Sequence, residues 1–175
     1  MAELTASRRS SGTEFLKECI ADALIRLMEN KTYEKITVQE ITDCANVGRA
    51  TYFRQFSSKE DVLMYKIRLL WRRWAKNHHT DKTHIYSVEN LTTFFEFIYS
   101  IRSLNSVLVK AEKMNVLIIA LSAEFGINDS ADPAERYRFC FIAFGLAGVL
   151  TEWIKHGYKE SPRDMIKYLA ESSFE

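Results

Sequence analysis

Proline is absent from the first 132 residues of this 175-residue chain, and both prolines, Pro133 and Pro162, fall in the last third. Because proline removes a backbone N–H and clashes with the preceding helical turn, its absence leaves few obligatory helix breaks. Apolar side chains recur at spacings of three and four residues almost throughout, which is the spacing of one helix face. The sequence therefore predicts an all-α fold of about nine helices and no strand.

Two short helices joined by a turn are expected between longer helices. Thr37 and Glu40 form a capping-box pattern, in which the Thr37 hydroxyl accepts from the N–H of residue 40 and the Glu40 carboxylate accepts from the N–H of Thr37. Gly48 is expected to supply the conformational freedom of a tight turn. A third helix follows over residues 49–56, and a helix this short must be held by its neighbours. This spacing predicts a helix-turn-helix unit.

The third helix is predicted to have two distinct faces. Ala50, Phe53 and Phe56 are expected to point inward. The outward set combines basic and hydrogen-bonding side chains, which suit phosphates and base edges: Arg49, Thr51, Tyr52, Arg54 and Gln55. The alternative is that this unit serves only for packing. In that case the clustering of Arg49, Thr51 and Arg54 on one stripe would have no explanation.

Residues 33–63 resemble the N-terminal domain of TetR-family transcription regulators. The matching positions are Ile36, Thr37, Val38, Ile41, Ala45, Val47, Thr51, Phe56, Lys59, Glu60 and Leu63. The resemblance implies that Thr37 and Lys59 hold DNA phosphates. It also implies that seven further residues lie at or in the major groove: Gly48, Arg49, Ala50, Thr51, Tyr52, Phe53 and Gln55.

Two positions depart from the family pattern. The family has Phe followed by Tyr where this chain has Tyr52 followed by Phe53, so the tyrosine hydroxyl that reaches a phosphate is missing at residue 53. Either Tyr52 replaces that contact or the contact is lost. Gln55 stands where the family has His, and its amide can still donate a hydrogen bond.

The second part of the chain resembles the region that pairs two TetR-like subunits. Residues 140–165 are similar to a subgroup that includes dihydroxyacetone-kinase regulators, and Gly145 and Gly148 would allow close approach of helices. We expect a homodimer through the last two helices, which would form a four-helix bundle and read a palindromic duplex operator.

An apolar ligand pocket is a further expectation for this part, with a packed core as the alternative for the same side chains. The candidate lining residues are Phe94, Phe97, Ile98, Phe139 and Phe144. We expect a repressor that a small-molecule effector releases from DNA. A TetR-like regulator controlled by a protein partner is the alternative.

Other function classes lack their sequence signals. The chain has no glycine-rich phosphate loop, nucleophile elbow, His-Glu-x-x-His or Cys-x-x-Cys motif, so we expect no enzyme, catalytic residue or cofactor. His78, His79 and His84 lie in a polar stretch without cysteine partners, and no metal is expected there. Residues 1–76 carry a net charge of +4 and residues 77–175 of −3, which permits a nucleic-acid-facing first part.

The chain is expected to act in the cytoplasm. No uninterrupted apolar run reaches the roughly 18 residues of a membrane span, and the start of the chain does not resemble a signal peptide. Cys19, Cys44 and Cys140 are odd in number and far apart, which is typical of core side chains in a reducing compartment. The expected organisation is a mobile polar arm (1–12), a helix-turn-helix DNA-binding domain (13–60), a connecting fourth helix (61–76), and a dimerisation and ligand-binding domain (77–175).

Overall fold

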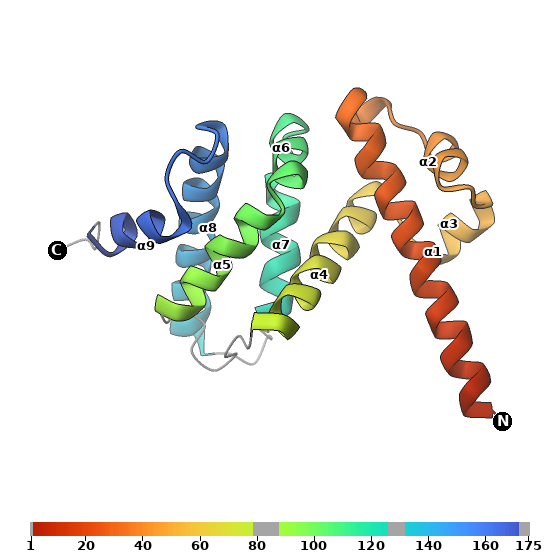
Figure 1. Cartoon of the computed structure of the whole chain (residues 1–175), viewed down its shortest axis with the longest axis horizontal. Helices are drawn as coiled ribbons and strands as arrows, with labels where there is room; N and C mark the ends of the chain where they lie inside the picture. The colour runs from red at the N-terminus through yellow and green to blue at the C-terminus, as the bar shows by residue number, and fades with distance from the viewer. Residues whose placement is uncertain (1, 79–87, 126–131, 172–175) are drawn as a thin grey trace. The chain divides into compact units, whose positions relative to one another are not determined.

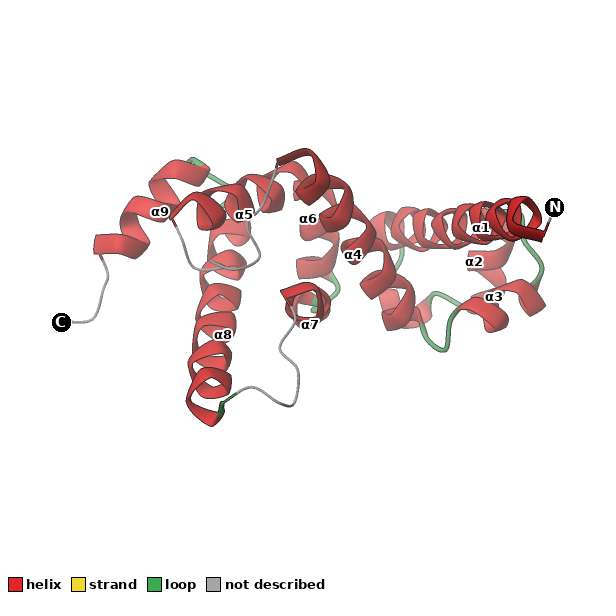
Figure 2. Cartoon of the chain, turned by 90° about the horizontal axis from the view of Figure 1, so that it is seen from below, coloured by secondary structure: helices red, strands yellow, loops and turns green. Residues whose placement is uncertain are grey.

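The computed structural model describes residues 2–78, 88–125 and 132–171, and within these ranges it is built entirely of helices and their connections (Figure 2). A short 3₁₀ turn spans Tyr33–Lys35. The α-helices are α1 (Ala2–Asn30), α2 (Val38–Ala45), α3 (Arg49–Gln55), α4 (Lys59–His78), α5 (Val88–Ser100), α6 (Arg102–Lys110), α7 (Met114–Phe125), α8 (Pro133–Lys155) and α9 (Pro162–Glu171). The predicted all-α fold of about nine helices is therefore confirmed for these ranges, while His79 and His84 lie outside them.

The first helix is longer than the sequence pattern indicated. α1 begins at Ala2, so residues 2–12, expected as a separate polar arm, are part of this helix. Polarity determines which residues can face solvent, but the backbone conformation depends on helix propensity. Six of these eleven residues are strong helix formers, namely two alanines, two arginines, one leucine and one glutamate.

The chain divides into two compact units, residues 1–66 and 67–175, with the boundary inside α4. In the first unit, α2 and α3 both contact α1 (Figure 1). Its core is apolar and drawn from all four helices: Ile20, Leu24, Ile41, Tyr52, Phe56, Val62 and Leu63. The short α2 and α3 thus gain their stability by burying one face against longer helices.

In the second unit, α5 packs on α9, while α6 and α7 pack on α8. The Trp71 ring of α4 makes edge contacts with Phe94 and Phe97 of α5, at centroid distances of 6.4 and 5.1 Å. Two arginines of α4 donate to one carboxylate of α7, with Arg68 Nε 2.5 Å and Arg72 Nε 2.9 Å from Glu124. These contacts tie the second half of α4 to the helices that follow it.

α8 leaves most of its apolar surface outside the core. Only 18% of its most apolar 18-residue window is buried, and that window has a mean hydropathy of 1.3. Among the described residues, α8 is the one helix that is long and apolar enough to cross a membrane. Charged residues interrupt its apolar stretch, so the sequence showed no continuous apolar run there. Cys140 of α8 is also exposed, contrary to the expectation of a core cysteine.

Candidate nucleic-acid interface

The start of α2 is held by the predicted capping box. The Thr37 hydroxyl accepts from the Glu40 backbone N–H at 3.3 Å, and the Thr37 backbone N–H donates to Glu40 Oε2 at 2.9 Å. Lys31 forms an ion pair with the other carboxylate oxygen of Glu40. The bonds from Lys31 and Thr37 lower the pKa of Glu40 to about 2. The carboxylate is therefore charged at any physiological pH and keeps α2 aligned with the end of α1.

The turn between α2 and α3 depends on Asn46 rather than on Gly48. Asn46 is in the left-handed region, with φ 52° and ψ 48°. The Asn46 N–H donates to the Asp43 carbonyl at 3.2 Å and the Val47 N–H to the Thr42 carbonyl at 3.0 Å, which is a Schellman ending. Gly48 has ordinary extended angles, φ −74° and ψ 147°, so the expected role of its conformational freedom is wrong. Asparagine tolerates the left-handed region better than most residues, and this was the available sequence signal.

The inner face of α3 differs from the one expected from the sequence. Tyr52 is 1% exposed and Phe56 is 4% exposed, whereas Phe53 is 57% exposed and Ala50 also faces solvent. Residues 52 and 56 are one helical turn apart, and their rings lie 6.1 Å apart in the core. The expected pair of residues 53 and 56 and the observed pair of residues 52 and 56 are both at helical spacing, so periodicity alone does not decide between Phe53 and Tyr52.

The outward face of α3 carries two exposed arginines, Arg49 and Arg54. The Arg49 guanidinium lies over the Phe53 ring, 5.9 Å from its centroid. A cation–π contact of this kind restricts a long side chain that would otherwise sample many rotamers. Thr51 and Gln55 are half-buried at the edges of this face. The face thus presents basic and hydrogen-bonding groups around an apolar ring.

Tyr52 does not replace the hydroxyl that is missing at residue 53. Its hydroxyl oxygen is buried and has no hydrogen-bond partner among the described residues. Burial raises the pKa of Tyr52, and the nearby carboxylates of Asp61 and Glu60 raise it further. The outward prediction for Tyr52 is therefore wrong, and the side chain belongs to the core.

Lys59, expected to hold a phosphate, bonds inward in this structure. Its ammonium donates to the carbonyls of Tyr33 and Ile36 at 2.6 and 2.8 Å, and it lies 4.4 Å from the centroid of the Tyr33 ring. Lys59 therefore joins the start of α4 to the 3₁₀ turn. The resemblance implies that Lys59 binds a phosphate, and these internal contacts compete with that role.

Side chains of α4 also form ion pairs and a hydrogen bond with carboxylates of α1. Buried Lys66 lies 2.7 Å from Asp22 and 3.4 Å from Glu18, and the Tyr65 hydroxyl donates to Glu14 Oε2 at 3.0 Å. α3 packs on α1 and α2, and the Phe56 ring at its C-terminal end lies 5.6 Å from the Tyr65 ring of α4, so the contacts between α1 and α4 support the helix.

Two family models match this chain. Residues 20–64 match the model described as bacterial regulatory proteins, tetR family, and residues 85–174 match the model described as transcriptional regulator C-terminal region. The second match alone covers just over half of the chain. The chain belongs to the TetR family of transcription regulators. It is accordingly a DNA-binding regulator with a helix-turn-helix unit, and not an enzyme.

Two solved structures share the fold of this TetR-family chain. The dihydroxyacetone kinase operon activator DhaS is 15% identical with a TM-score of 0.51, and the alignment covers 89% of this chain and 92% of DhaS. The fatty acid degradation regulator FadR from Bacillus halodurans is 17% identical with a TM-score of 0.52, covering 89% of this chain and 93% of FadR. None of the curated proteins matched by sequence.

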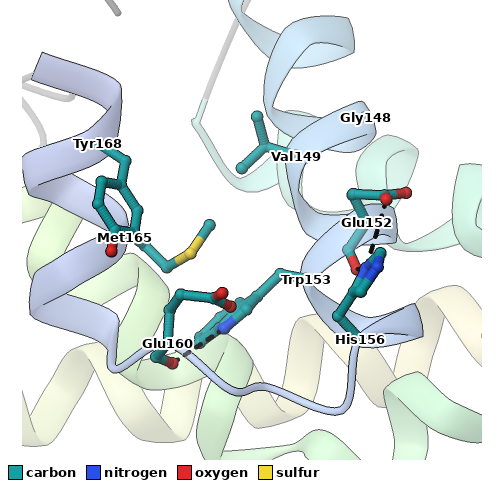
Figure 3. Close-up of a pocket in the computed structure, with 8 residues that line it drawn as sticks. All are labelled: Gly148, Val149, Glu152, Trp153, His156, Glu160, Met165 and Tyr168. Carbon is teal, nitrogen blue, oxygen red and sulfur yellow. Dashed lines mark hydrogen bonds and ion pairs between the residues drawn. The ribbon is translucent and has the colours of Figure 1, made fainter. Parts of the chain in front are cut away.

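The expected ligand-pocket residues of this TetR-family chain do not come together. Phe94, Phe97 and Ile98 are buried in the core of the second unit, whereas Phe144 is 74% exposed on α8. The side chain of Phe139 lies outside the described residues. A different depression lies between α8 and α9, an open groove of about 540 Å³ (Figure 3). The spacing of these aromatic residues along the chain does not show which of them are buried in the core and which are exposed on the surface.

Proposed function

We propose that this regulator reads a palindromic DNA duplex as a homodimer, with the outward face of α3 in the major groove. The observation that carries the proposal is the exposure of Arg49 and Arg54 on a helix whose opposite face is locked in the core by Tyr52 and Phe56. Guanidinium groups recognise guanine edges and phosphates, and a short helix presented in this way fits the width of the groove. A second copy is needed because one such helix reads only a few base pairs.

The neighbouring residues would support this docking. Thr37 lies at the exposed start of α2, where backbone N–H groups and the helix dipole favour a phosphate. Gly48 and Ala50 are exposed and small, so the DNA backbone can approach closely beside them. Thr51 and Gln55 supply hydrogen bonds at the edges of the contact, and Phe53 positions Arg49. Lys59 contributes by fixing the start of α4 rather than as a free cation.

The homodimer would form through α8 and α9. Tyr137, Phe141 and Phe144 of α8 are 76%, 70% and 74% exposed, and Tyr168 of α9 is 51% exposed. Contiguous exposed aromatic residues are characteristic of protein interfaces, and a two-fold interface would cover the same face on both copies. We place the protein in the cytoplasm, where its DNA target is accessible.

We further propose repression as the mode of action, with release of the DNA on arrival of an effector. One observation favours a protein partner over a small molecule as that effector. The aromatic residues expected to line a pocket instead fill the core, where Phe97 contacts both Trp71 and Trp74. A thermal-shift screen against metabolites separates the two modes, because a ligand of the folded state raises the melting temperature.

DNA recognition is tested by selecting duplexes from a random pool and measuring their affinities by fluorescence anisotropy. Arg49→Ala should reduce the preference for the selected sequence by about fivefold or more, as expected for loss of one base contact. Arg26→Ala is the matched control, since Arg26 is exposed on α1 in the same unit and its loss changes the net charge equally. Failure of the folded, dimeric protein to bind any duplex at low salt would refute the proposal. Equal loss of preference in both variants would also refute it.

A further inference from the structure

We propose that Phe53 is a specificity-determining residue, whose ring contacts the 5-methyl group of a thymine within two base pairs of a guanine bound by Arg49. This contact rests on the docking of α3 proposed above. It adds one base, and one atom group of that base, to what the helix recognises. It also gives a role to an exposed ring that carries no hydroxyl for a phosphate.

The exposed side chains of α3 form one patch that contains an aromatic ring. Phe53 is 57% exposed, and the other exposed residues of the helix are Arg49, Ala50 and Arg54. At 3.6 residues per turn, these four side chains follow one another around the helix in the order Arg49, Phe53, Ala50, Arg54. The phenyl ring therefore lies inside the patch, between a cation and a small side chain that lets DNA approach.

The Phe53 ring is held by contacts on two sides. Its centroid lies 5.4 Å from that of Tyr52, with the two rings inclined at 83°, and Tyr52 is 1% exposed in the core. The Arg49 guanidinium lies over the ring, 5.9 Å from its centroid. The rest of the ring faces solvent from a defined position. Covering it with DNA therefore costs less ordering than covering a side chain that is free to rotate.

The chemistry of the phenyl ring limits what it can recognise. It has no hydrogen-bond donor or acceptor, so it cannot bind phosphate oxygens or the polar edges of bases. Covering such groups would remove their water without replacing its hydrogen bonds. The 5-methyl of thymine is the methyl group that the bases present in the major groove, and phenylalanine is among the side chains that contact it. Burial of this methyl against the ring is thus the favourable base contact available to Phe53.

The spacing of residues 49 and 53 limits how far apart their two bases can be. Four residues correspond to about 6 Å along the helix axis, whereas successive base pairs of DNA are about 3.4 Å apart. Two side chains on one stripe therefore reach base pairs at most about two steps apart. The Arg49 guanidinium suits the O6 and N7 acceptors of guanine. The preferred half-site should thus contain a guanine and a thymine within two base pairs.

Thr51 is the competing candidate for a thymine contact, since its own methyl group can touch that of the base. Thr51 is half-buried and lies about 160° around the helix from Phe53. The two side chains lie on different sides of α3 and cannot cover the same methyl group. Substitution of each in turn therefore identifies the one that makes the contact.

Deoxyuridine substitution tests the contact, because it removes the thymine methyl and leaves the base pair intact. Each thymine of the selected half-site is replaced in turn, at both symmetric positions, and the affinity of the full chain is measured by fluorescence anisotropy. One position should bind about tenfold more weakly, since a buried methyl contributes about fourfold in each half-site. Phe53→Ala should reduce this difference to less than twofold. Phe53→Tyr, which keeps the ring, and Thr51→Ala should leave it unchanged.

The outcomes separate this contact from DNA binding itself. Phe53 is more than half exposed, so its variants should fold as the parent does, which circular dichroism verifies. A methyl effect that persists in Phe53→Ala or disappears in Thr51→Ala would overturn the inference and leave recognition by α3 standing, as would a half-site in which no thymine methyl affects affinity. A sensitive thymine more than two base pairs from the guanine whose preference is lost in Arg49→Ala would overturn the pairing of the two residues. Failure to bind any duplex at low salt would overturn the proposed function.

Discussion

Removal of the Tyr52 hydroxyl should stabilise the protein. The ring is 1% exposed, and its hydroxyl lacks a hydrogen-bond partner among the described residues. A buried hydroxyl without a partner costs about 1–3 kcal/mol, because it gives up its bonds to water and gains none in return. Tyr52→Phe keeps the ring contacts with Phe53 and Phe56 and removes only that oxygen. We expect the free energy of unfolding of the first unit to rise by about 1 kcal/mol or more.

The measurement must report on the first unit. All three tryptophans, Trp71, Trp74 and Trp153, lie in residues 67–175, so their fluorescence follows the second unit. Hydrogen exchange of the α3 amides reports on residues 1–66, whereas far-ultraviolet circular dichroism during urea unfolding follows the helices of both units. Tyr65→Phe is the matched control, because its hydroxyl donates to Glu14 and its loss should cost about 1 kcal/mol. A loss of stability in Tyr52→Phe as large as that in Tyr65→Phe would show that the Tyr52 hydroxyl is satisfied and would refute the reasoning.

Three further predictions concern the same unit. Phe53→Tyr should tighten binding to a duplex about threefold to tenfold, since it places a hydroxyl on the outward face within reach of a phosphate; unchanged anisotropy titrations would place residue 53 away from the DNA backbone. Lys59→Met should lower the free energy of unfolding by about 1–3 kcal/mol through loss of its bonds to the 3₁₀ turn. A large loss of DNA affinity at unchanged stability would instead assign Lys59 to a phosphate. Because the pKa of Glu40 is lowered from 4.5 to about 2, its stabilising effect is complete above about pH 4.5 and is lost as the pH falls toward 2. Glu40→Gln should therefore flatten the acid limb of the stability profile, whereas Glu34→Gln, an exposed control, should leave the limb steep.

Short-range patterns in the sequence determined most of the secondary structure of this protein, and the start of α1 at Ala2 is the exception. The absence of early proline, the apolar spacing and the capping box from Thr37 to Glu40 act within one or two helical turns, and the structure contains each of the corresponding features. The spacing of α2 and α3 also predicted the helix-turn-helix unit. Such signals depend on backbone hydrogen bonds and on contacts between side chains that are close in sequence. These interactions do not require any other helix to be in place.

Tertiary packing decided which side chains face outward and which contacts they make. Phe53 is more apolar than Tyr52, yet Tyr52 is buried, because the direction of the α3 inner face is set by α1 and α2, on which α3 packs. Lys59 turns inward because the 3₁₀ turn brings two carbonyls within reach, across more than twenty residues of sequence. The aromatic residues of α5 and α8 share a composition, but α5 is covered by its neighbours and the outer face of α8 is not. Burial and long-range hydrogen bonds depend on how helices are arranged in space, and periodicity along the chain does not encode that arrangement.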